Sequence, residues 1–238
     1  MKKLIGSAYD EPPFHYGGGL AMNVIFRTDR EIIEAVLPPV LKPLSSRNLA
    51  VVRVSSPFRS HMGAYTSSYI FLPALFGDQR VEHMVTGMKT TFSGVVGGRE
   101  VWGMPLQMGD VTMGWEGDVL SVVAKRFSVE FMRLNVRLEE TVEPPEARGP
   151  SMTTYEVQRR PWETSPTQNA LVAITGKPPE AVTEGSSQRW RGSAVLKFPG
   201  GVPGDDWSIF PVHEVLSVDY TVNEGRSSLD SGVVIAEW

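Results

Sequence analysis

Short segments rich in β-branched and aromatic residues, many with apolar and polar side chains in alternation, recur along most of the chain. This pattern predicts β-strands, because side chains of a strand point alternately to its two faces. Glycines and prolines, 23 and 18 in number, supply the turns between them. The predicted strands are Asn23–Arg27, Leu49–Val54, Tyr65–Leu72, Val81–Phe92, Val119–Phe127, Glu130–Glu139, Ser193–Lys197 and Val215–Val222. Their number and spacing predict a barrel or a sandwich.

A helix is predicted directly after the first strand. Thr28 and Glu31 have the spacing of a capping box, apolar residues follow at helical intervals, and Pro38 ends the helix. Further along, residues 141–168 are expected to form a long connection that contains one short strand at Met152–Gln158. A second helix or turn is predicted at Lys177–Thr183. The triplet Gly17–Gly19 is expected to form a bulge or turn entering the first strand, in preference to an anion cradle, because no helix start follows it.

Composition narrows the classes of function. A chain of 238 residues with 41% apolar residues can fold as one domain, expected here to span residues 1–238. The net charge of −4, with both signs mixed along the chain, argues against binding to nucleic acid or an anionic membrane. No apolar run is long enough to span a bilayer, and the apolar stretch near the start is short for a secretion signal. A cytoplasmic location is therefore expected.

Familiar catalytic motifs are missing. The chain has no cysteine, and its histidines, His15, His61, His83 and His213, lie far apart, so no metal site is expected. It contains no Walker loop, no dinucleotide-binding fingerprint and no Gly-x-Ser-x-Gly elbow. We therefore expect no cofactor.

The most informative segment, 97–109, reads Gly-Gly-Arg-Glu-Val-Trp-Gly-Met-Pro-Leu-Gln-Met-Gly. It resembles the signature of the acetoacetate decarboxylase superfamily, a Gly-Arg-Glu-aromatic-Gly-aromatic-Pro run followed by two lysines. Further similar segments are Asn23–Asp29, Gly63–Thr66, Arg189–Gly192 and Phe210–Val215. The resemblance implies a single-domain, largely antiparallel, conical β-barrel with a closed and mostly apolar cavity. It also implies a homo-oligomer.

That family uses a lysine that forms an imine with a ketone substrate, but Leu106 and Gln107 occupy the two lysine positions here. By alignment, the substrate-facing arginine of the family falls at Gly19, and its two glutamates fall at Ser67 and near Val52. The resemblance therefore implies a retained scaffold whose pocket has been rebuilt.

Two residues are candidates to replace the missing lysine. The amide of Gln107, following Pro105, can donate to a carbonyl or an oxyanion. Lys89, on a strand predicted to run beside the motif, could be a relocated imine lysine, although a lysine in a strand is more often exposed. Alternation could instead place Met88 and Thr90 inside the barrel.

Other polar residues near the former glutamate positions are candidates for binding and proton transfer. Arg53 or Arg59 could hold a carboxylate, and Tyr65, His61 or Ser67 could relay a proton. Glu130 interrupts an apolar strand; it could be an inward-facing acid with a raised pKa, or it could pair with Arg133 or Arg126.

The remaining motif residues are expected to build the walls. Arg99 and Glu100 are interpreted as structural. An apolar, adaptable pocket wall is predicted from Met88, Trp102, Met104 and Leu106.

The leading hypothesis is an enzyme that acts lyase-like on a small keto- or polyketide-like metabolite, by decarboxylation, dehydration or cyclisation. It would work without an imine at the usual lysine position. Two alternatives stay open: a hydrolase of an enol lactone that uses activated water, and a non-catalytic small-molecule binding protein.

Overall fold

A closed ring of seven β-strands organises the structure. This is a computed structural model that describes residues 13–143, 151–158, 169–177, 187–230 and 232–238. Around the ring the strands are β10 (Ser151–Gln158), β5 (Gln79–Lys89), β4 (Ser67–Phe76), β3 (Leu49–Pro57), β1 (Phe14–Arg27), β15 (Glu214–Leu229) and β11 (Asn169–Lys177). Pairing of β11 with both β10 and β15 closes the barrel. The β5–β10 pair is parallel, and the other pairs of the ring are antiparallel.

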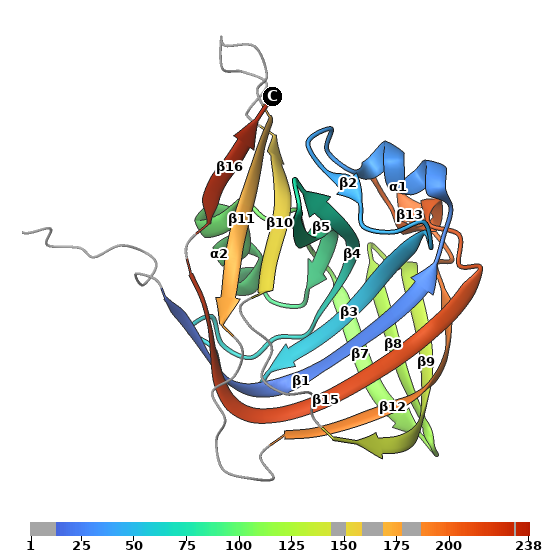
Figure 1. Ribbon diagram of the computed structural model, residues 1–238. Helices are drawn as coiled ribbons and strands as arrows, with labels where there is room; N and C mark the ends of the chain where they lie inside the picture. The colour runs from blue at the N-terminus through green and yellow to red at the C-terminus, as the bar shows by residue number, and fades with distance from the viewer. Residues whose placement is uncertain (1–12, 144–150, 159–168, 178–186, 231) are drawn as a thin grey trace, which may run out of the picture.

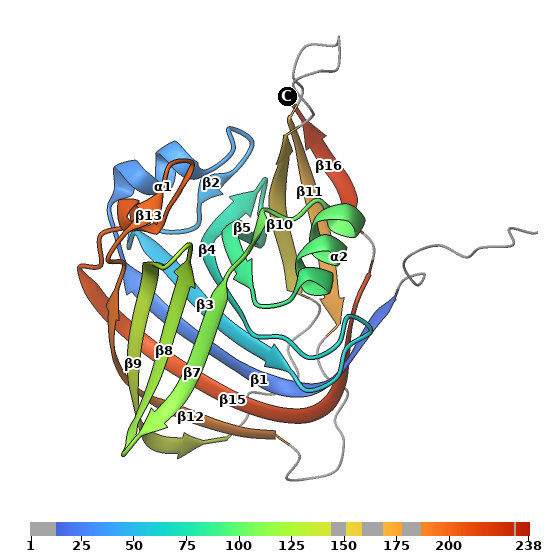
Figure 2. The same cartoon turned by 180° about the vertical axis from the view of Figure 1, so that it is seen from behind.

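A second group of strands extends the sheet beyond β15 and folds back over one side of the barrel, as Figure 2 shows for β7, β8 and β9. In order from β15 they are β12 (Ser187–Lys197), β9 (Val129–Val142), β8 (Val119–Arg126) and β7 (Asp110–Glu116). The short strands are β2 (Lys42–Pro43), β6 (Leu106–Met108), β13 (Gly201–Val202), β14 (Asp205–Asp206) and β16 (Val233–Glu237).

Helix α1 (Arg30–Val36) lies at one end of the molecule, far from α2 (Phe92–Trp102), and a 3₁₀ turn spans Trp207–Ile209 (Figure 1). As predicted, α1 stops before Pro38. The predicted capping box is wrong: Asp29 is the N-cap, and the hydroxyl of the buried Thr28 has no hydrogen-bond partner. None of the helices in the described ranges is long and apolar enough to cross a membrane.

The segment around the 97–109 motif differs most from the sequence prediction. The strand expected to run to Phe92 ends at Lys89, and α2 begins at once. Thr91 caps this helix by accepting from the Gly94 N–H at 3.2 Å. Gly103, with φ 73°, ends it in the left-handed conformation that suits glycine.

Most other strand predictions are confirmed, including the short strand near Met152, which is β10. The predicted bulge is confirmed as a register shift between Gly17 and Gly19 inside β1, where Gly18 has φ 67°. The predicted element at Lys177–Thr183 falls almost wholly outside the described residues.

Two apolar clusters lie on opposite faces of the wall formed by β1, β3, β4 and β5. The outer core packs that wall against β7, β8, β9 and β12, with members such as Val52, Ile70, Met88, Val122, Phe131 and Leu134. The inner core lies on the barrel side and joins β3, β4, β5, β10 and β11 to α2. It consists of Phe14, Val51, Met62, Tyr69, Phe71, Met84, Val95, Trp102, Met104, Leu106, Tyr155, Val172 and Ile174.

Candidate active site

Lys89 lies at the last position of β5 with its side chain on the barrel side, and it is only 3% exposed. Its backbone pairs with Ser67 of β4, which pairs in turn with Ser55 of β3. The amine Nζ lies 4.5 Å from the centroid of the Tyr65 ring. Tyr65 lies in the segment just before β4. This segment therefore contributes the aromatic ring that packs against the amine at the end of the neighbouring strand β5.

Burial lowers the pKa of Lys89 from 10.5 to about 8. No charged group contributes to this change, and in the described part of the chain no carboxylate forms an ion pair with the amine. A group with a pKa of about 8 is neutral in roughly one molecule in ten at pH 7. Only the neutral form of an amine can act as a nucleophile, so the lowered pKa makes this chemistry accessible to Lys89 near neutral pH.

Helix α2 can approach Lys89 closely because glycines face it. A Cβ on Gly94 would lie 3.3 Å from Cδ of Lys89. A Cβ on Gly98 would lie 3.7 Å from the Lys89 amine and only 2.3 Å from a methyl group of Leu106. Leu106 pairs with Gly87, next to Lys89 on the same face of β5. The Lys89 amine therefore lies beside Leu106, which occupies one of the two positions where the resemblance places the family's lysines.

Hydroxyl groups surround this part of the barrel. The Ser67 hydroxyl donates to the Ser55 carbonyl at 3.0 Å, which leaves the Ser55 hydroxyl to donate to Ser67 Oγ at 2.9 Å. Burial raises the pKa of Tyr69, and the adjacent hydroxyls of Ser67 and Ser55 oppose that rise. Burial also raises the pKa values of Tyr65 and Tyr16, whose phenols lie within hydrogen-bonding reach of each other. These groups can pass protons without carrying a charge.

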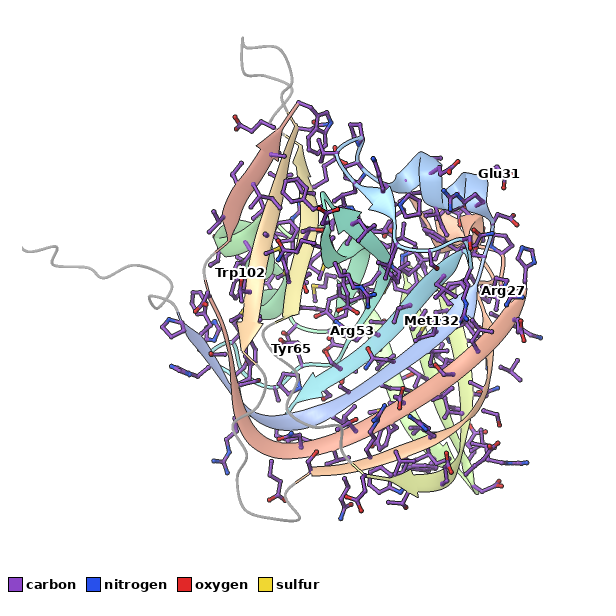
Figure 3. All side chains as sticks on the ribbon, in the orientation of Figure 1. Arg27, Glu31, Arg53, Tyr65, Trp102 and Met132 are labelled. Atoms are coloured by element: carbon purple, nitrogen blue, oxygen red, sulfur yellow. The ribbon has the colours of Figure 1, made fainter. Side chains whose placement is uncertain are left out.

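Arg53 lies on β3 two residues before Ser55, so both side chains point to the barrel side. Its Nε donates to the Asn23 side-chain oxygen at 2.6 Å, and one terminal nitrogen reaches both oxygens of Glu82 at 3.0 and 2.9 Å. The guanidinium lies 4.5 Å from the centroid of the Phe71 ring. Figure 3 shows Arg53 and Tyr65 between the β10–β11 pair and β3.

Several predicted site residues lie away from this cluster. Gln107 is half-buried, pairs with Met88 and lines grooves beside α2. Met88 is fully buried in the outer core, so its predicted place in the pocket wall is wrong. Glu130 forms an ion pair with Arg133 at 2.6 Å, which lowers the pKa of Glu130. Of the two alternatives for Glu130, the structure shows the ion pair.

The other predicted residues lie around the inner core. Leu106, Trp102 and Met104 belong to it, and the indole N–H of Trp102 donates to the Asp230 carbonyl at 3.1 Å. His61 is exposed and stacks on Phe14. Gly19 lies in β1 opposite Pro57, on the face that carries Asn23.

Of the site residues not foreseen from sequence, Tyr16, Asn23, Ser55, Tyr69 and Glu82 are the main ones. Each lies on a strand at even spacing from a residue that faces the barrel interior, so strict alternation would have found Ser55 from Arg53 and Tyr69 from Ser67. Another unforeseen residue, the buried His83, bonds Thr154 at 3.2 Å, and burial lowers its pKa to about 4. Within the described ranges, no group of three or more His, Asp or Glu residues could hold a metal ion.

A family model described as acetoacetate decarboxylase matches residues 5–236 of the chain. The chain belongs to the acetoacetate decarboxylase family. An acetoacetate decarboxylase of Chromobacterium violaceum is 28% identical over 120 residues, 49% of this chain and 47% of the relative. A second, from Mesorhizobium japonicum, is 25% identical over 117 residues, 49% and 44% of the two chains. The matches thus span about half the length of these relatives.

Solved structures of the acetoacetate decarboxylase fold cover nearly the whole chain. The acetoacetate decarboxylase of Legionella pneumophila superposes with a TM-score of 0.85 at 18% identity, over 100% of this chain and 93% of that one. The enduracididine biosynthesis enzyme MppR, complexed with pyruvate, gives 0.78 at 19% identity over 97% and 93%. An acetoacetate decarboxylase-like enzyme from Sphingomonas wittichii gives 0.75 at 15% identity over 99% and 97%. These likenesses support the fold expected from the resemblance.

Proposed function

We propose that this protein is a lyase-type enzyme that forms an imine between Lys89 and a small oxo compound. One observation carries the proposal: a buried amine with a lowered pKa lies beside Leu106, which occupies one of the two lysine positions of the family motif. The imine nitrogen would thus reach the same region of the barrel from strand β5 instead of β6. The broader chemistry of the family can survive the loss of its usual lysine in this way.

The chemistry begins with the neutral Lys89 amine attacking the substrate carbonyl carbon. A C–N bond forms, the carbonyl oxygen takes one proton from the amine nitrogen and a second from a neighbouring proton donor, and it leaves as water to give the protonated imine. The positive nitrogen then draws electrons from a bond next to the former carbonyl carbon, which favours breaking a C–C bond or removing a proton there. Decarboxylation, dehydration and condensation all share this intermediate, and MppR was solved with pyruvate and with a condensation product of pyruvate.

Tyr65 and Ser67 are proposed to serve proton transfer at the imine. The Tyr65 ring lies under the amine, and Ser67 is its direct neighbour across the strand pair. A phenol or hydroxyl can donate to the departing carbonyl oxygen and accept a proton in return.

A mechanism that relies on the Gln107 amide in place of an imine has less support. Gln107 shares its strand face with Met88, which packs in the outer core, whereas Lys89 faces the barrel. Neither enol-lactone hydrolysis nor simple ligand binding is favoured by a specific feature of the cluster.

Reductive trapping tests the proposal. The protein is treated with sodium borohydride in the presence of pyruvate, 4-oxopentanoate or 2-butanone, and the modified residue is located by peptide mass spectrometry. We expect an adduct on Lys89 and its loss in Lys89→Met. Lys197→Met, which removes an exposed lysine at the end of β12, serves as the control and should keep the adduct. Failure of all three probes to label Lys89 would overturn the proposal.

A further inference from the structure

A groove beside α2, called the α2 groove below, gathers exposed apolar side chains on one surface. It measures about 960 Å³ and is lined by residues of α2, β6, the start of β7 and the tip of the β8–β9 hairpin. Figure 2 shows α2 and this hairpin on the same side of the molecule. Phe127 and Phe92, 76% and 71% exposed, are the two most exposed large apolar residues in the described part of the chain, and both line the groove together with the half-exposed Met108. A cluster of this kind marks an interaction surface.

The backbone holds Phe127 in its exposed position at a cost in free energy. Phe127 and Ser128 form the two-residue turn between β8 and β9, with φ 50° and φ 64°. Positive φ at both positions is typical of a type I′ turn, which favours Asn and Gly and strains a bulky side chain. The Arg126 guanidinium lies 4.7 Å from the centroid of the ring, yet most of the ring stays in water. We therefore expect a partner that buries the ring to compensate for the strain.

The charges that line the α2 groove are balanced. Arg99 and Arg126 contribute two positive charges, and Glu100 and Asp110 contribute two negative ones. Asp205 neutralises Arg126 at 3.3 Å. Arg99 and Asp110 are exposed and form no ion pair with any residue in the described ranges. A surface with one unpaired charge of each sign does not select a polyanion such as nucleic acid or an anionic membrane. It is complementary to another surface that carries one charge of each sign.

A second copy of the same chain provides such a surface. In a contact with two-fold symmetry each chain presents the same patch, so every residue pair occurs twice with the chains exchanged. The hairpin tip that carries Phe127 borders the groove, so one surface supplies both an exposed ring and a hollow that can receive it. In that arrangement Arg99 of one subunit faces Asp110 of the partner subunit, and the symmetry forms the same pair a second time.

We infer that the protein forms a homodimer with two-fold symmetry through the α2 groove. Phe92, Met108 and Phe127 supply the apolar area that association removes from water, and the two Arg99–Asp110 pairs fix the register of the copies. Because Lys89 does not line the groove, this inference is independent of the proposed imine.

Sedimentation velocity at several protein concentrations tests the surface. We expect the parent protein to form dimers and Phe127→Asn to weaken the association by at least about tenfold, as for an aromatic residue central to an interface. Asn adopts the left-handed conformation more readily than Phe, so the variant should stay folded, which circular dichroism checks. The same substitution at Phe58, which is 50% exposed and does not line the groove, is the matched control and should leave the association unchanged.

Charge reversal tests the symmetry. Arg99→Glu would place two pairs of carboxylates across the interface and Asp110→Arg two pairs of cations, so each variant alone should associate at least about tenfold more weakly than the parent. In an equimolar mixture, the new carboxylate at position 99 of one chain meets the new cation at position 110 of the other, and the second pair is the original Arg99–Asp110. We expect native mass spectrometry to show dimers with one chain of each variant, which misfolded chains would not form.

A parent protein that stays monomeric at every concentration would overturn the inference. Dimers that survive Phe127→Asn and both charge reversals, or charge variants that stay dissociated when mixed, would do the same. A monomer that carries a bound small molecule in the native mass spectrum would instead assign the α2 groove to that ligand.

Discussion

The two cores share one wall of strands and have opposite chemistry. Along β3, Val52 and Val54 enter the outer core, while Arg53 and Ser55 alternate with them and face the barrel. The members of the outer core are apolar, and the Ser68 hydroxyl beside them contacts the sulfur of Met132. The barrel side holds a lysine, an arginine and several hydroxyls among its apolar residues. Period-two alternation therefore lets one strand stabilise the fold with one face and present reactive groups with the other.

This division predicts that substitutions on the two faces have separable effects. Burial of the outer-core residues stabilises the folded protein. Burial of Lys89 destabilises it, because the charge of the amine is taken out of water. A change on the barrel side should therefore alter chemistry more than stability, or alter the two in opposite directions. A change in the outer core should do the reverse.

The largest effect is expected from Lys89→Met. Borohydride-dependent labelling should fall by about a thousandfold or more, because the nucleophile is gone. Stability at pH 7 should rise by on the order of 2–3 kcal/mol, because one pKa unit corresponds to about 1.4 kcal/mol and Met buries no charge. Urea denaturation of both proteins measures the difference.

The pH dependence of the stability gain in Lys89→Met shows whether the buried charge causes it. A lysine whose folded-state pKa is lowered destabilises the fold fully below about pH 8, and the penalty disappears as pH rises toward 10.5. The stability advantage of Lys89→Met should therefore be constant below pH 8 and shrink above it. A difference that does not vary between pH 7 and 10 would mean that packing, and not the buried charge, is responsible.

A change in stability of similar size but opposite sign is expected from Leu134→Ala in the outer core. Leu134 is fully buried, and such truncations cost about 2–5 kcal/mol. Labelling of Lys89 per folded molecule should stay within about twofold of the parent, since the change lies across the wall from the amine. Labelling is compared at a temperature where the variant is fully folded. A tenfold loss of labelling in folded Leu134→Ala would show that the two faces are coupled.

A smaller effect is expected from Gly98→Ala in α2. The new Cβ would stand 2.3 Å from a methyl group of Leu106, which must shift, and in ordinary van der Waals contact with the Lys89 amine at 3.7 Å. We expect labelling to slow by about ten- to a hundredfold, because the displaced Leu106 side chain lies beside the amine and small displacements of a reacting group are costly. Gly114→Ala in β7 is the control, since a Cβ there meets no atom within 4 Å. Equal labelling of the two variants would show that the packing of α2 does not affect the reactivity of Lys89.

The barrel could be predicted from the strand pattern and the resemblance, but α2 could not. Its glycines weaken helix propensity, and their reason is tertiary: they let the helix approach Lys89 and Leu106. The signals that mark it are the Thr91 cap and Gly103 at its end, which are short and easily missed beside a strand-like run. The side on which Gln107 lies could not be predicted either, because the side of a strand on which a residue lies depends on where that strand begins.

The smallest effect is expected from Gln107→Ala, and it sharpens the comparison within a single short strand. Gln107 and Leu106 are neighbours in β6, but Leu106 is fully buried in the inner core while Gln107 lines grooves outside it. Gln107→Ala should change labelling of Lys89 by less than about twofold and stability by less than about 0.5 kcal/mol, as for an ordinary surface position. Leu106→Ala should instead lower stability by about 2–5 kcal/mol and open space beside the amine. A tenfold loss of labelling in Gln107→Ala would return that amide to the site and place the reacting carbonyl in the grooves that Gln107 lines.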